Sequence, residues 1–352
     1  PHSRQIVVLL AAVLAVLLLI TGSLLLARKV IFLEREPVAP SGDDIPNQPP
    51  ETGNPIATPG SHPFADGPTG TVTFPFAADS RVIGKNSIRS ARAVMVDLSA
   101  GEVVASRLAD EKMYPASMTK IMTLIVAVEN LSESVSLSYK VTVSSAVYGA
   151  MRLAGSSGMG LEAGEQLTVE ALLYLTALQS DGIAASELAR YIAGDEASFV
   201  QLMNRKASAM GLTNTHFANP TGLQDEANYS TCRDMAAILS YAMRMSLCRR
   251  ILTTDSYNAT CTGRDAGYSF TYYVSNKFLT LLSQADKGKP DSLTMTAGKT
   301  GYAGNNSGFC LASYAVGADG HAYICVTSQA TGSDGYLTCI RDHVSLYNAY
   351  TN

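Results

Sequence analysis

The segment Pro115-Ala116-Ser117-Met118-Thr119-Lys120 places a serine and a lysine three positions apart at the start of a long apolar run. Residues 118–128 are apolar except for Lys120 and two threonines, which predicts a helix that is buried on most sides. Residues three apart lie on the same helix face, so the Ser117 hydroxyl and the Lys120 amine can meet without long-range folding.

This spacing indicates nucleophilic chemistry, because a serine hydroxyl becomes a good nucleophile when a neighbouring base takes its proton. A lysine can be that base when burial or nearby positive charge lowers its pKa. The alternative is an ordinary lysine that snorkels from a helix start to solvent. S-x-x-K occurs about once by chance in a chain of this length, so the interpretation depends on support from elsewhere in the sequence.

The surrounding pattern is mixed. Two β-rich runs flank a short turn ahead of Ser117, several helical segments follow, and the last quarter of the chain is again β-rich. Strands at both ends with helices between them predict an α+β domain, whose N- and C-terminal segments share one antiparallel sheet beside a helical subdomain. The predicted strands are 92–98, 102–106, 268–274, 308–316 and 321–327, and the predicted helices are 118–128, 168–178, 184–193, 197–210, 231–245 and 337–350.

The N-terminal part does not resemble a globular domain. Residues 6–27 carry no charge, and as a helix they would extend about 33 Å, enough for a hydrocarbon core of about 30 Å. A cleaved signal peptide is the alternative, but its apolar region is shorter and no A-x-A-like site follows. Ten of the fourteen prolines lie in residues 37–75, which indicates an extended tether. We therefore expect a short N-terminal segment (1–5), a transmembrane anchor (6–27), a Pro/Gly-rich juxtamembrane tether (28–80) and one folded domain (81–352).

Composition excludes some function classes. The net charge is −4 and there is no basic patch outside the apolar segment's flanks, so we expect no nucleic-acid partner. The six cysteines have neither C-x-x-C nor Cys/His spacing, so we expect no metal and no cofactor. The thiols could form disulfides or remain free and buried, and the sequence leaves both open.

Two further segments carry candidate site residues. Lys299-Thr300-Gly301 precedes the strand predicted over 308–316 and lacks the glycine spacing of a nucleotide-binding P-loop. In an acyl-transfer site, such a lysine lowers the pKa of a second lysine and attracts a carboxylate, which the threonine hydroxyl can bind. The glycine lets substrate backbone lie against an edge strand. A surface turn is the alternative.

Ser180-Asp181-Gly182 follows the helix predicted over 168–178, where a serine is often only a cap or turn residue. No histidine is spaced to suggest a Ser-His-Asp triad.

In this order, the three segments resemble the serine D-alanyl-D-alanine carboxypeptidases among the low-molecular-weight penicillin-binding proteins. These share the S-x-x-K, S-x-N and K-T-G set with serine β-lactamases. The resemblance covers about residues 91–350 and includes G-S-S-G-M-G-L-E-A-G-E at 155–165, N-T-H-F-A-N-P-T-G-L at 214–223 and K-T-G-Y-A-G-N-N-S-G-F-C-L at 299–311. It implies the serine β-lactamase/DD-peptidase fold and a penicillin-sensitive hydrolase that removes the terminal D-alanine of peptidoglycan stem peptides.

By this resemblance, Ser117 would be the acylated nucleophile, Lys120 its general base, and Ser180 a proton relay to the leaving group. The substrate carboxylate would be bound, and the site lined, by Lys299, Thr300 and Gly301. The oxyanion hole would consist of the backbone N–H groups of Ser117 and Tyr302, and losing one such donor typically costs about 3–4 kcal/mol.

The sequence departs from the family pattern at Gly182, where an asparagine is expected to contact Lys120 and the substrate backbone. The Asp181 side chain or a water could replace that amide. No clear counterpart exists for an arginine that some members place after K-T-G, and Arg341 is the nearest candidate. The alternatives are therefore a catalytically impaired penicillin- or peptidoglycan-binding homologue, or a β-lactamase, against which the absence of E-x-x-L-N after Ser180 counts.

The implied partners are the peptidoglycan stem peptide, β-lactam antibiotics as acylating inhibitors, and the cytoplasmic membrane. Peptidoglycan lies outside that membrane, so we expect a single-pass cell-membrane protein with an extracytoplasmic catalytic domain. The cations flanking residues 6–27 favour the opposite orientation by the positive-inside rule, and the substrate argument overrides it.

Overall fold

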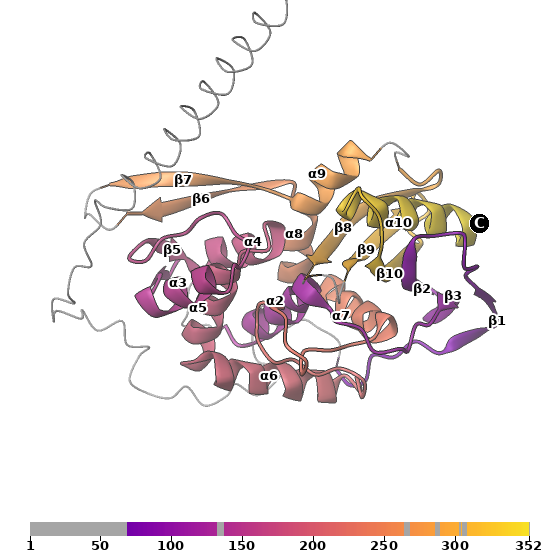
Figure 1. Ribbon diagram of the computed structural model, residues 1–352, viewed down its shortest axis with the longest axis horizontal. Coiled ribbons are helices and arrows are strands. Elements are labelled where there is room, and N and C mark those ends of the chain that lie inside the picture. The colour runs from indigo at the N-terminus through magenta and orange to yellow at the C-terminus, as the bar shows by residue number, and fades with distance from the viewer. Residues whose placement is uncertain are drawn as a thin grey trace, which may run out of the picture. The chain divides into compact units, whose positions relative to one another are not determined.

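Figure 1 shows a computed structural model of the chain, in which residues 69–131, 137–263, 268–285, 289–302, 304 and 308–351 are described. The chain divides into two compact units, residues 1–48 and residues 49–352, and all the described residues belong to the second unit. The anchor expected over 6–27 and residues 28–68 of the expected tether lie outside the described residues. The end of that tether was predicted wrongly, because Val72 and Phe74 are buried in the core and Phe76 begins strand β1 (Phe76–Val82), so the folded unit starts before residue 81. None of the helices in the described ranges combines the length and the hydrophobicity that spanning a bilayer requires.

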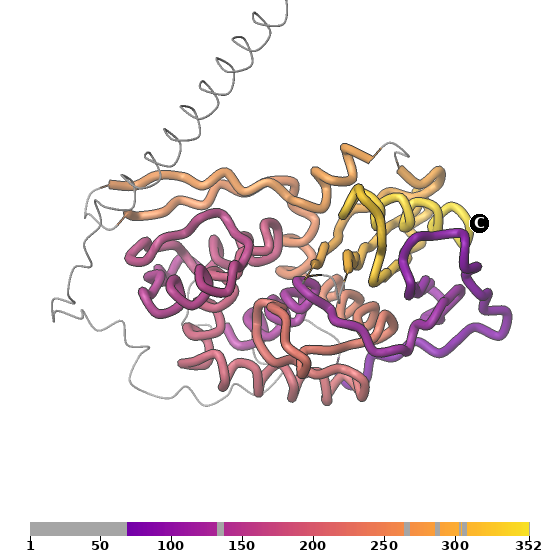
Figure 2. Tube along the Cα trace, in the orientation of Figure 1, coloured from indigo at the N-terminus to yellow at the C-terminus, as the bar shows by residue number. Residues whose placement is uncertain are grey.

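A six-stranded sheet joins the two ends of the folded unit. Its strand order is β1-β3-β2-β10-β9-β8, and every neighbouring pair is antiparallel except β1 and β3. The N-terminal hairpin β2–β3 thus lies beside the C-terminal strand β10 (Figures 1 and 2). This confirms the predicted shared sheet. The strands are β1 (Phe76–Val82), β2 (Ser90–Asp97), β3 (Glu102–Arg107), β8 (Leu293–Tyr302), β9 (Phe309–Gly317) and β10 (Ala322–Ala330).

Both faces of this sheet are buried, because its strands alternate apolar side chains between two cores. On β2, Val94 and Val96 belong to one core, whereas Ala93 and Met95 belong to the other. Helices α7 (Cys232–Arg244) and α8 (Ser246–Thr253) cover the first face, and α9 (Lys277–Gln284) and α10 (Tyr336–Tyr350) cover the second.

A buried carboxylate ties α10 to the first strand of the hairpin. Asp342 accepts hydrogen bonds from the backbone N–H of Arg89 (3.0 Å), and from the backbone N–H (2.7 Å) and hydroxyl (2.6 Å) of Ser90.

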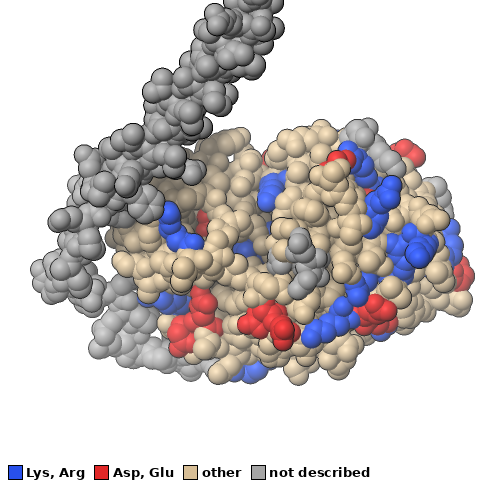
Figure 3. Space-filling view, viewed as in Figure 1, with Lys and Arg blue, Asp and Glu red and all other residues tan. Residues whose placement is uncertain are grey.

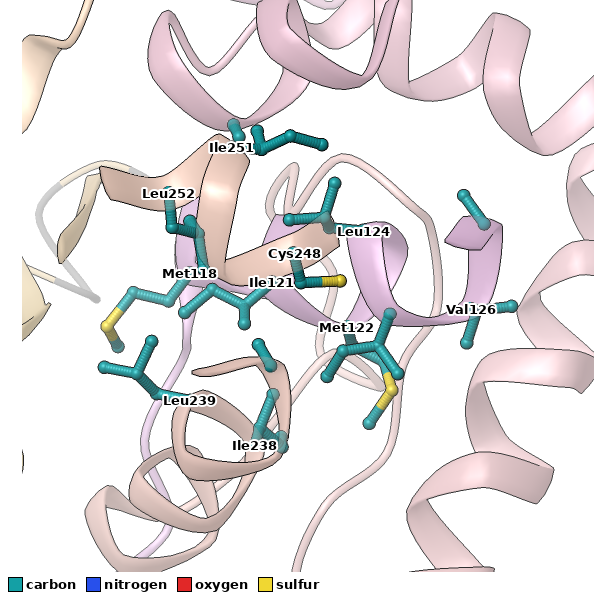
Figure 4. Close-up of a cluster of buried hydrophobic side chains, with 14 of the residues drawn as sticks. Met118, Ile121, Met122, Leu124, Val126, Ile238, Leu239, Cys248, Ile251 and Leu252 are labelled. Carbon is teal, nitrogen blue, oxygen red and sulfur yellow. The ribbon is translucent and has the colours of Figure 1, made fainter. Parts of the chain in front are cut away.

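The remaining helices form a second part around α2 (Thr119–Glu129), whose residues 119–128 are all buried. Figure 4 shows Ile121, Met122 and Leu124 of α2 packed among side chains of α7 and α8, including Ile238, Leu239, Cys248, Ile251 and Leu252. The predicted buried helix is thus confirmed. Other elements of this part are α3 (Ser145–Leu153), α4 (Val169–Leu178), α5 (Gly182–Ala193), α6 (Glu196–Ala209) and a small sheet of β4 (Lys140–Thr142), β5 (Gln166–Thr168), β6 (Ser256–Thr262) and β7 (Ser269–Ser275).

The predicted helices and strands agree with the structure to within a few residues at each end. The K-T-G triplet precedes strand β9, as predicted, but it is not a surface turn and belongs to a strand that was not predicted. It lies inside β8, an edge strand of the large sheet. The six cysteines are all buried free thiols, so of the two states that the sequence allowed, disulfides or free thiols, the structure has the second.

Candidate active site

Ser117 and Lys120 meet at the start of α2, as predicted. Ser117 lies in a 3₁₀ turn, η1 (Ala116–Met118), and Lys120 lies in the first turn of the helix that follows. The Lys120 Nζ atom is 3.3 Å from the Ser117 Oγ atom. The serine side chain remains partly exposed while the lysine is only 2% exposed, so a substrate can reach the hydroxyl but water barely reaches the amine.

The loop over residues 219–223 orients the Lys120 amine. Lys120 Nζ donates a hydrogen bond of 2.5 Å to the Thr221 carbonyl. The Asn219 side-chain oxygen fixes this loop by accepting from the backbone N–H groups of Thr221, Gly222 and Leu223. At Gly222 (φ +75°), a Cβ atom would lie 1.9 Å from the Ala116 carbonyl oxygen, so glycine lets the loop reach the turn that carries Ser117.

Burial makes Lys120 a competent base near neutral pH. Burial is the largest effect and lowers the pKa of Lys120 to about 7. The charge of the Asp181 carboxylate opposes this shift, and the positive charge of Lys277 adds to it. At pH 7 a large fraction of the amine is therefore neutral, and it can accept the Ser117 proton.

Ser180 and Lys299 form a second buried pair. Lys299 Nζ donates to Ser180 Oγ (2.9 Å) and to the Thr300 carbonyl (3.1 Å). Ser180 has a left-handed backbone (φ +61°), which a structure holds only where the surroundings compensate the strain. Burial, followed by the charges of Lys120 and Lys277, holds the pKa of Lys299 well below its usual value. The two lysines predicted from sequence thus share one electrostatic environment.

Edge strand β8 lies directly against the nucleophile turn. A Cβ atom on Gly301 would approach the Cys310 Sγ atom to 2.6 Å and the Pro115 carbonyl oxygen to 2.9 Å. Only glycine permits this packing, which explains the third position of K-T-G. Thr300 is buried beside it, and the Tyr302 side chain is 43% exposed at the end of the strand.

The structure also shows what occupies the space of the expected asparagine. A Cβ atom on Gly182 would lie 1.8 Å from the Ser156 Oγ atom, so the loop over 155–160 packs where a side chain would begin. Asp181 does not replace the amide by a hydrogen bond to Lys120. Its two carboxylate oxygens accept from the backbone N–H groups of Ala184 (2.9 Å) and Met159 (2.7 Å), and it acts on Lys120 only through its charge.

The remaining candidate is not supported. Arg341 lies on α10 in an ion pair with Asp334, and no contact in the described part of the chain joins it to Ser117, Lys120 or Lys299. Sequence reasoning missed Lys277, whose charge acts on both site lysines. Its position in an eight-residue helix after Asn276 carried no distinctive spacing. The Asn-Pro-Thr-Gly turn chemistry at 219–222 was a usable signal for the loop that holds Lys120.

The chain is similar to known D-alanyl-D-alanine carboxypeptidases in sequence and to a DD-transpeptidase in structure. D-alanyl-D-alanine carboxypeptidase DacF of Bacillus subtilis is 38% identical over 170 residues, and DacC of Escherichia coli is 40% identical over 166 residues. The alignments cover 47% and 46% of this chain but only 43% and 41% of those proteins, so the matched segment spans less than half the length of these relatives. The DD-transpeptidase of Streptomyces K15 has a TM-score of 0.67 at 28% identity, over 76% of this chain and 99% of that one.

The structural likeness confirms the mixed α+β fold that the resemblance implied. Residues 79–331, most of the chain, match the D-alanyl-D-alanine carboxypeptidase family S11, and the chain belongs to this family of peptidases.

Proposed function

We propose that this chain is a serine-type D-Ala-D-Ala carboxypeptidase that removes the terminal D-alanine of peptidoglycan stem peptides. The main support is the buried Lys120 amine with a pKa of about 7, 3.3 Å from the hydroxyl of Ser117. An exposed lysine remains protonated at this pH and could not act as a base. A serine hydroxyl without such a neighbour would be a weak nucleophile.

In the proposed acylation step, neutral Lys120 takes the Ser117 proton as Oγ attacks the carbonyl carbon of the penultimate D-alanine. The resulting oxyanion accepts hydrogen bonds from the backbone N–H groups of Ser117 and Tyr302. The two donors come from the helix start and the edge strand that Gly301 brings together. Lys299 and Thr300 bind the terminal carboxylate.

Collapse of the tetrahedral intermediate breaks the peptide bond. Ser180 passes its hydroxyl proton to the leaving nitrogen and regains a proton from the Lys120 ammonium, which returns to the neutral amine. The Ser180 hydroxyl accepts a hydrogen bond from Lys299 Nζ, which leaves its own proton free to pass on. Free D-alanine then departs, and water hydrolyses the ester on Ser117 to restore the enzyme. A β-lactam would acylate the same hydroxyl.

We also propose that the protein acts at the outer side of the cytoplasmic membrane, held there by the uncharged segment 6–27. The support is the length of that segment and the location of the proposed substrate. Protease treatment of intact spheroplasts should degrade the folded unit, whereas a cytoplasmic domain would survive until the membrane is opened.

The test of the activity is release of D-alanine from diacetyl-L-Lys-D-Ala-D-Ala, with a time course of intact mass in benzylpenicillin run in parallel. Release together with a lasting penicillin adduct supports the proposal. Rapid drug turnover without a lasting adduct would instead indicate a β-lactamase. Neither release nor adduct would indicate a non-catalytic binding homologue, which the glycine at position 182 makes the main alternative.

A further inference from the structure

A groove outside the candidate active site lies beside the first described residues of the chain. Its volume is about 560 Å³, within the range of ligand-binding sites, which is about 300–1,000 Å³. One wall consists of residues 71–74 and the turn between β2 and β3, and the other consists of α7 and α8. None of the described residues that line it belongs to the candidate active site, so its use would be separate from the chemistry at Ser117.

The first wall is fixed to the fold by alternate residues. Val72 and Phe74 are buried in the core, and the Val72 N–H donates to the Met210 carbonyl (3.0 Å). Thr71 and Thr73 alternate with them and are exposed on the groove side. This wall therefore presents two threonines on a backbone that is held in place.

The opposite wall contains a hydroxyl group without a partner. Ser240 on α7 is only 5% exposed, and its Oγ atom forms no hydrogen bond with the residues that the structure describes. A buried polar group without a partner is unfavourable. Because Ser240 lines the groove, its hydroxyl can bond a molecule that enters there.

Two arginines bring positive charge to the same wall. Arg244 follows Ser240 by four residues on α7, so the two side chains lie on one helix face, and Arg249 lies on α8. Both arginines are exposed, and within the described ranges neither forms an ion pair with a carboxylate. Arg249 is the fourth residue of α8, at the end where the helix dipole disfavours a cation, so helix stability does not explain its position.

This positive charge is not compensated within the groove. Among the described residues that line it, none has a carboxylate. The adjacent Asp97 accepts from the backbone N–H groups of Ser99 (2.8 Å) and Ala100 (3.0 Å), so it is engaged in the turn. On the face in Figure 3, by contrast, Lys and Arg side chains are interspersed with Asp and Glu. The groove should therefore attract an anion.

Carboxylate groups fit this set of donors. A guanidinium group binds a carboxylate through two parallel hydrogen bonds, and the Ser240 hydroxyl adds a further donor. The proposed substrate supplies such groups, because every stem peptide ends in a carboxylate both before and after the terminal D-alanine is removed. A glycan strand carries many stem peptides, so a strand that is bound at Ser117 can present further carboxylates elsewhere on the protein.

We propose that the groove lined by Thr71, Thr73, Ser240, Arg244 and Arg249 is a second binding site for peptidoglycan. Its two arginines bind the carboxylate ends of stem peptides other than the one being cleaved. This rests on the proposed carboxypeptidase function. Binding at two sites raises the effective concentration of the polymer at the nucleophile, so the groove should matter for polymeric substrate and not for a short soluble peptide.

The first test measures binding apart from catalysis. The full chain with Ser117→Ala, in detergent, is sedimented with purified peptidoglycan sacculi at low salt, with and without the pair Arg244→Gln and Arg249→Gln. The matched control is the pair Lys85→Gln and Arg205→Gln, two exposed cations outside the groove. Loss of two exposed charge pairs should weaken binding about 3- to 30-fold, and high salt should abolish the difference. The control pair should bind as the parent protein does.

Two further comparisons identify the groups involved. Ser240→Ala should weaken binding about 2- to 10-fold without lowering Tm, because the hydroxyl has no partner within the described part of the fold. Sacculi whose carboxylates have been converted to amides should bind the parent protein as weakly as untreated sacculi bind the double arginine variant. Undiminished binding to the amidated sacculi would overturn the assignment of carboxylates as the ligand.

The second test compares D-alanine release from sacculi and from diacetyl-L-Lys-D-Ala-D-Ala, with Ser117 intact. The double arginine variant should lose on sacculi the factor seen in binding, and should change by about twofold or less on the tripeptide. An equal loss on both substrates, an equal loss in the control pair, or no loss on sacculi overturns the second site and leaves the carboxypeptidase function in place. A wild-type protein that releases nothing from the tripeptide overturns the function, whereas the sedimentation result decides the groove by itself.

Discussion

Replacing Gly182 by asparagine, the residue expected from the family pattern, should destabilise this protein rather than improve it. The added Cβ atom would lie 1.8 Å from Ser156 Oγ and 3.0 Å from Ser156 Cβ. The loop over 155–160 cannot simply withdraw, because the Gly182 N–H donates to the Ser157 carbonyl (3.0 Å) and the Met159 N–H donates to Asp181 (2.7 Å). Overpacking of this kind costs about 1–3 kcal/mol.

For a domain of this size, that free energy corresponds to a fall in Tm of about 2–4 °C per kcal/mol. Removing the opposing side chain in Ser156→Gly should relieve the overlap, so the double variant should be more stable than the sum of the single variants by about 1–3 kcal/mol. Gly149→Asn is the matched control, because a Cβ atom there meets nothing within 4 Å. Thermal unfolding of all four variants and wild type measures the coupling. A Gly182→Asn protein as stable as wild type, or an additive double variant, would refute the reasoning.

Three further predictions concern the base, the sheet and the thiols. The rate of β-lactam acylation should rise with pH through about 7, because Lys120 must lose its proton to act. Asp181→Asn removes a charge that raises the Lys120 pKa, so it should move the midpoint of this rise to lower pH. A rate that stays constant from about pH 5 to 9 would exclude Lys120 as the base. Asp342→Ala leaves the donors of Ser90 without their acceptor and should cost about 1–3 kcal/mol in the free energy of unfolding, and an unchanged urea midpoint would contradict this. The thiol reagent DTNB should react with none of the six cysteines in the native protein and with all six after denaturation, because each is buried, as Cys232 is with a pKa raised to about 12. Fast reaction of one thiol in the native state would show that it is exposed.

Local features of the sequence predicted much of the fold. The hairpin 92–106 and the long helices carry strong period-2 or apolar signals, and the structure has them at almost the same residues. The helix at α9 was missed because eight residues carry too little periodicity to identify. Strand β8 was missed because Gly298 and Gly301 weaken the local strand signal, whereas its pairing with β9 depends on long-range contacts.

In the candidate site, too, local contacts were predictable from the sequence and long-range contacts were not. The Ser117–Lys120 contact is local and follows from their spacing of three residues on one helix. The contact of Lys120 with Thr221 joins residues 101 positions apart, and that of Lys299 with Ser180 joins residues 119 apart. Spacing carries no information on such pairs, and only the resemblance suggested the second. The overlap of Ser156 with position 182 depends on how one loop packs, which no sequence pattern indicates.

The most direct test of the central claim is the intact mass of the protein after incubation with benzylpenicillin, followed by peptide mapping of any adduct. The wild-type protein should gain the mass of one penicillin molecule, located on Ser117, and Ser117→Ala should gain none. An adduct that persists in Ser117→Ala, or that maps to another residue of the wild type, would contradict the assignment of Ser117 as the nucleophile.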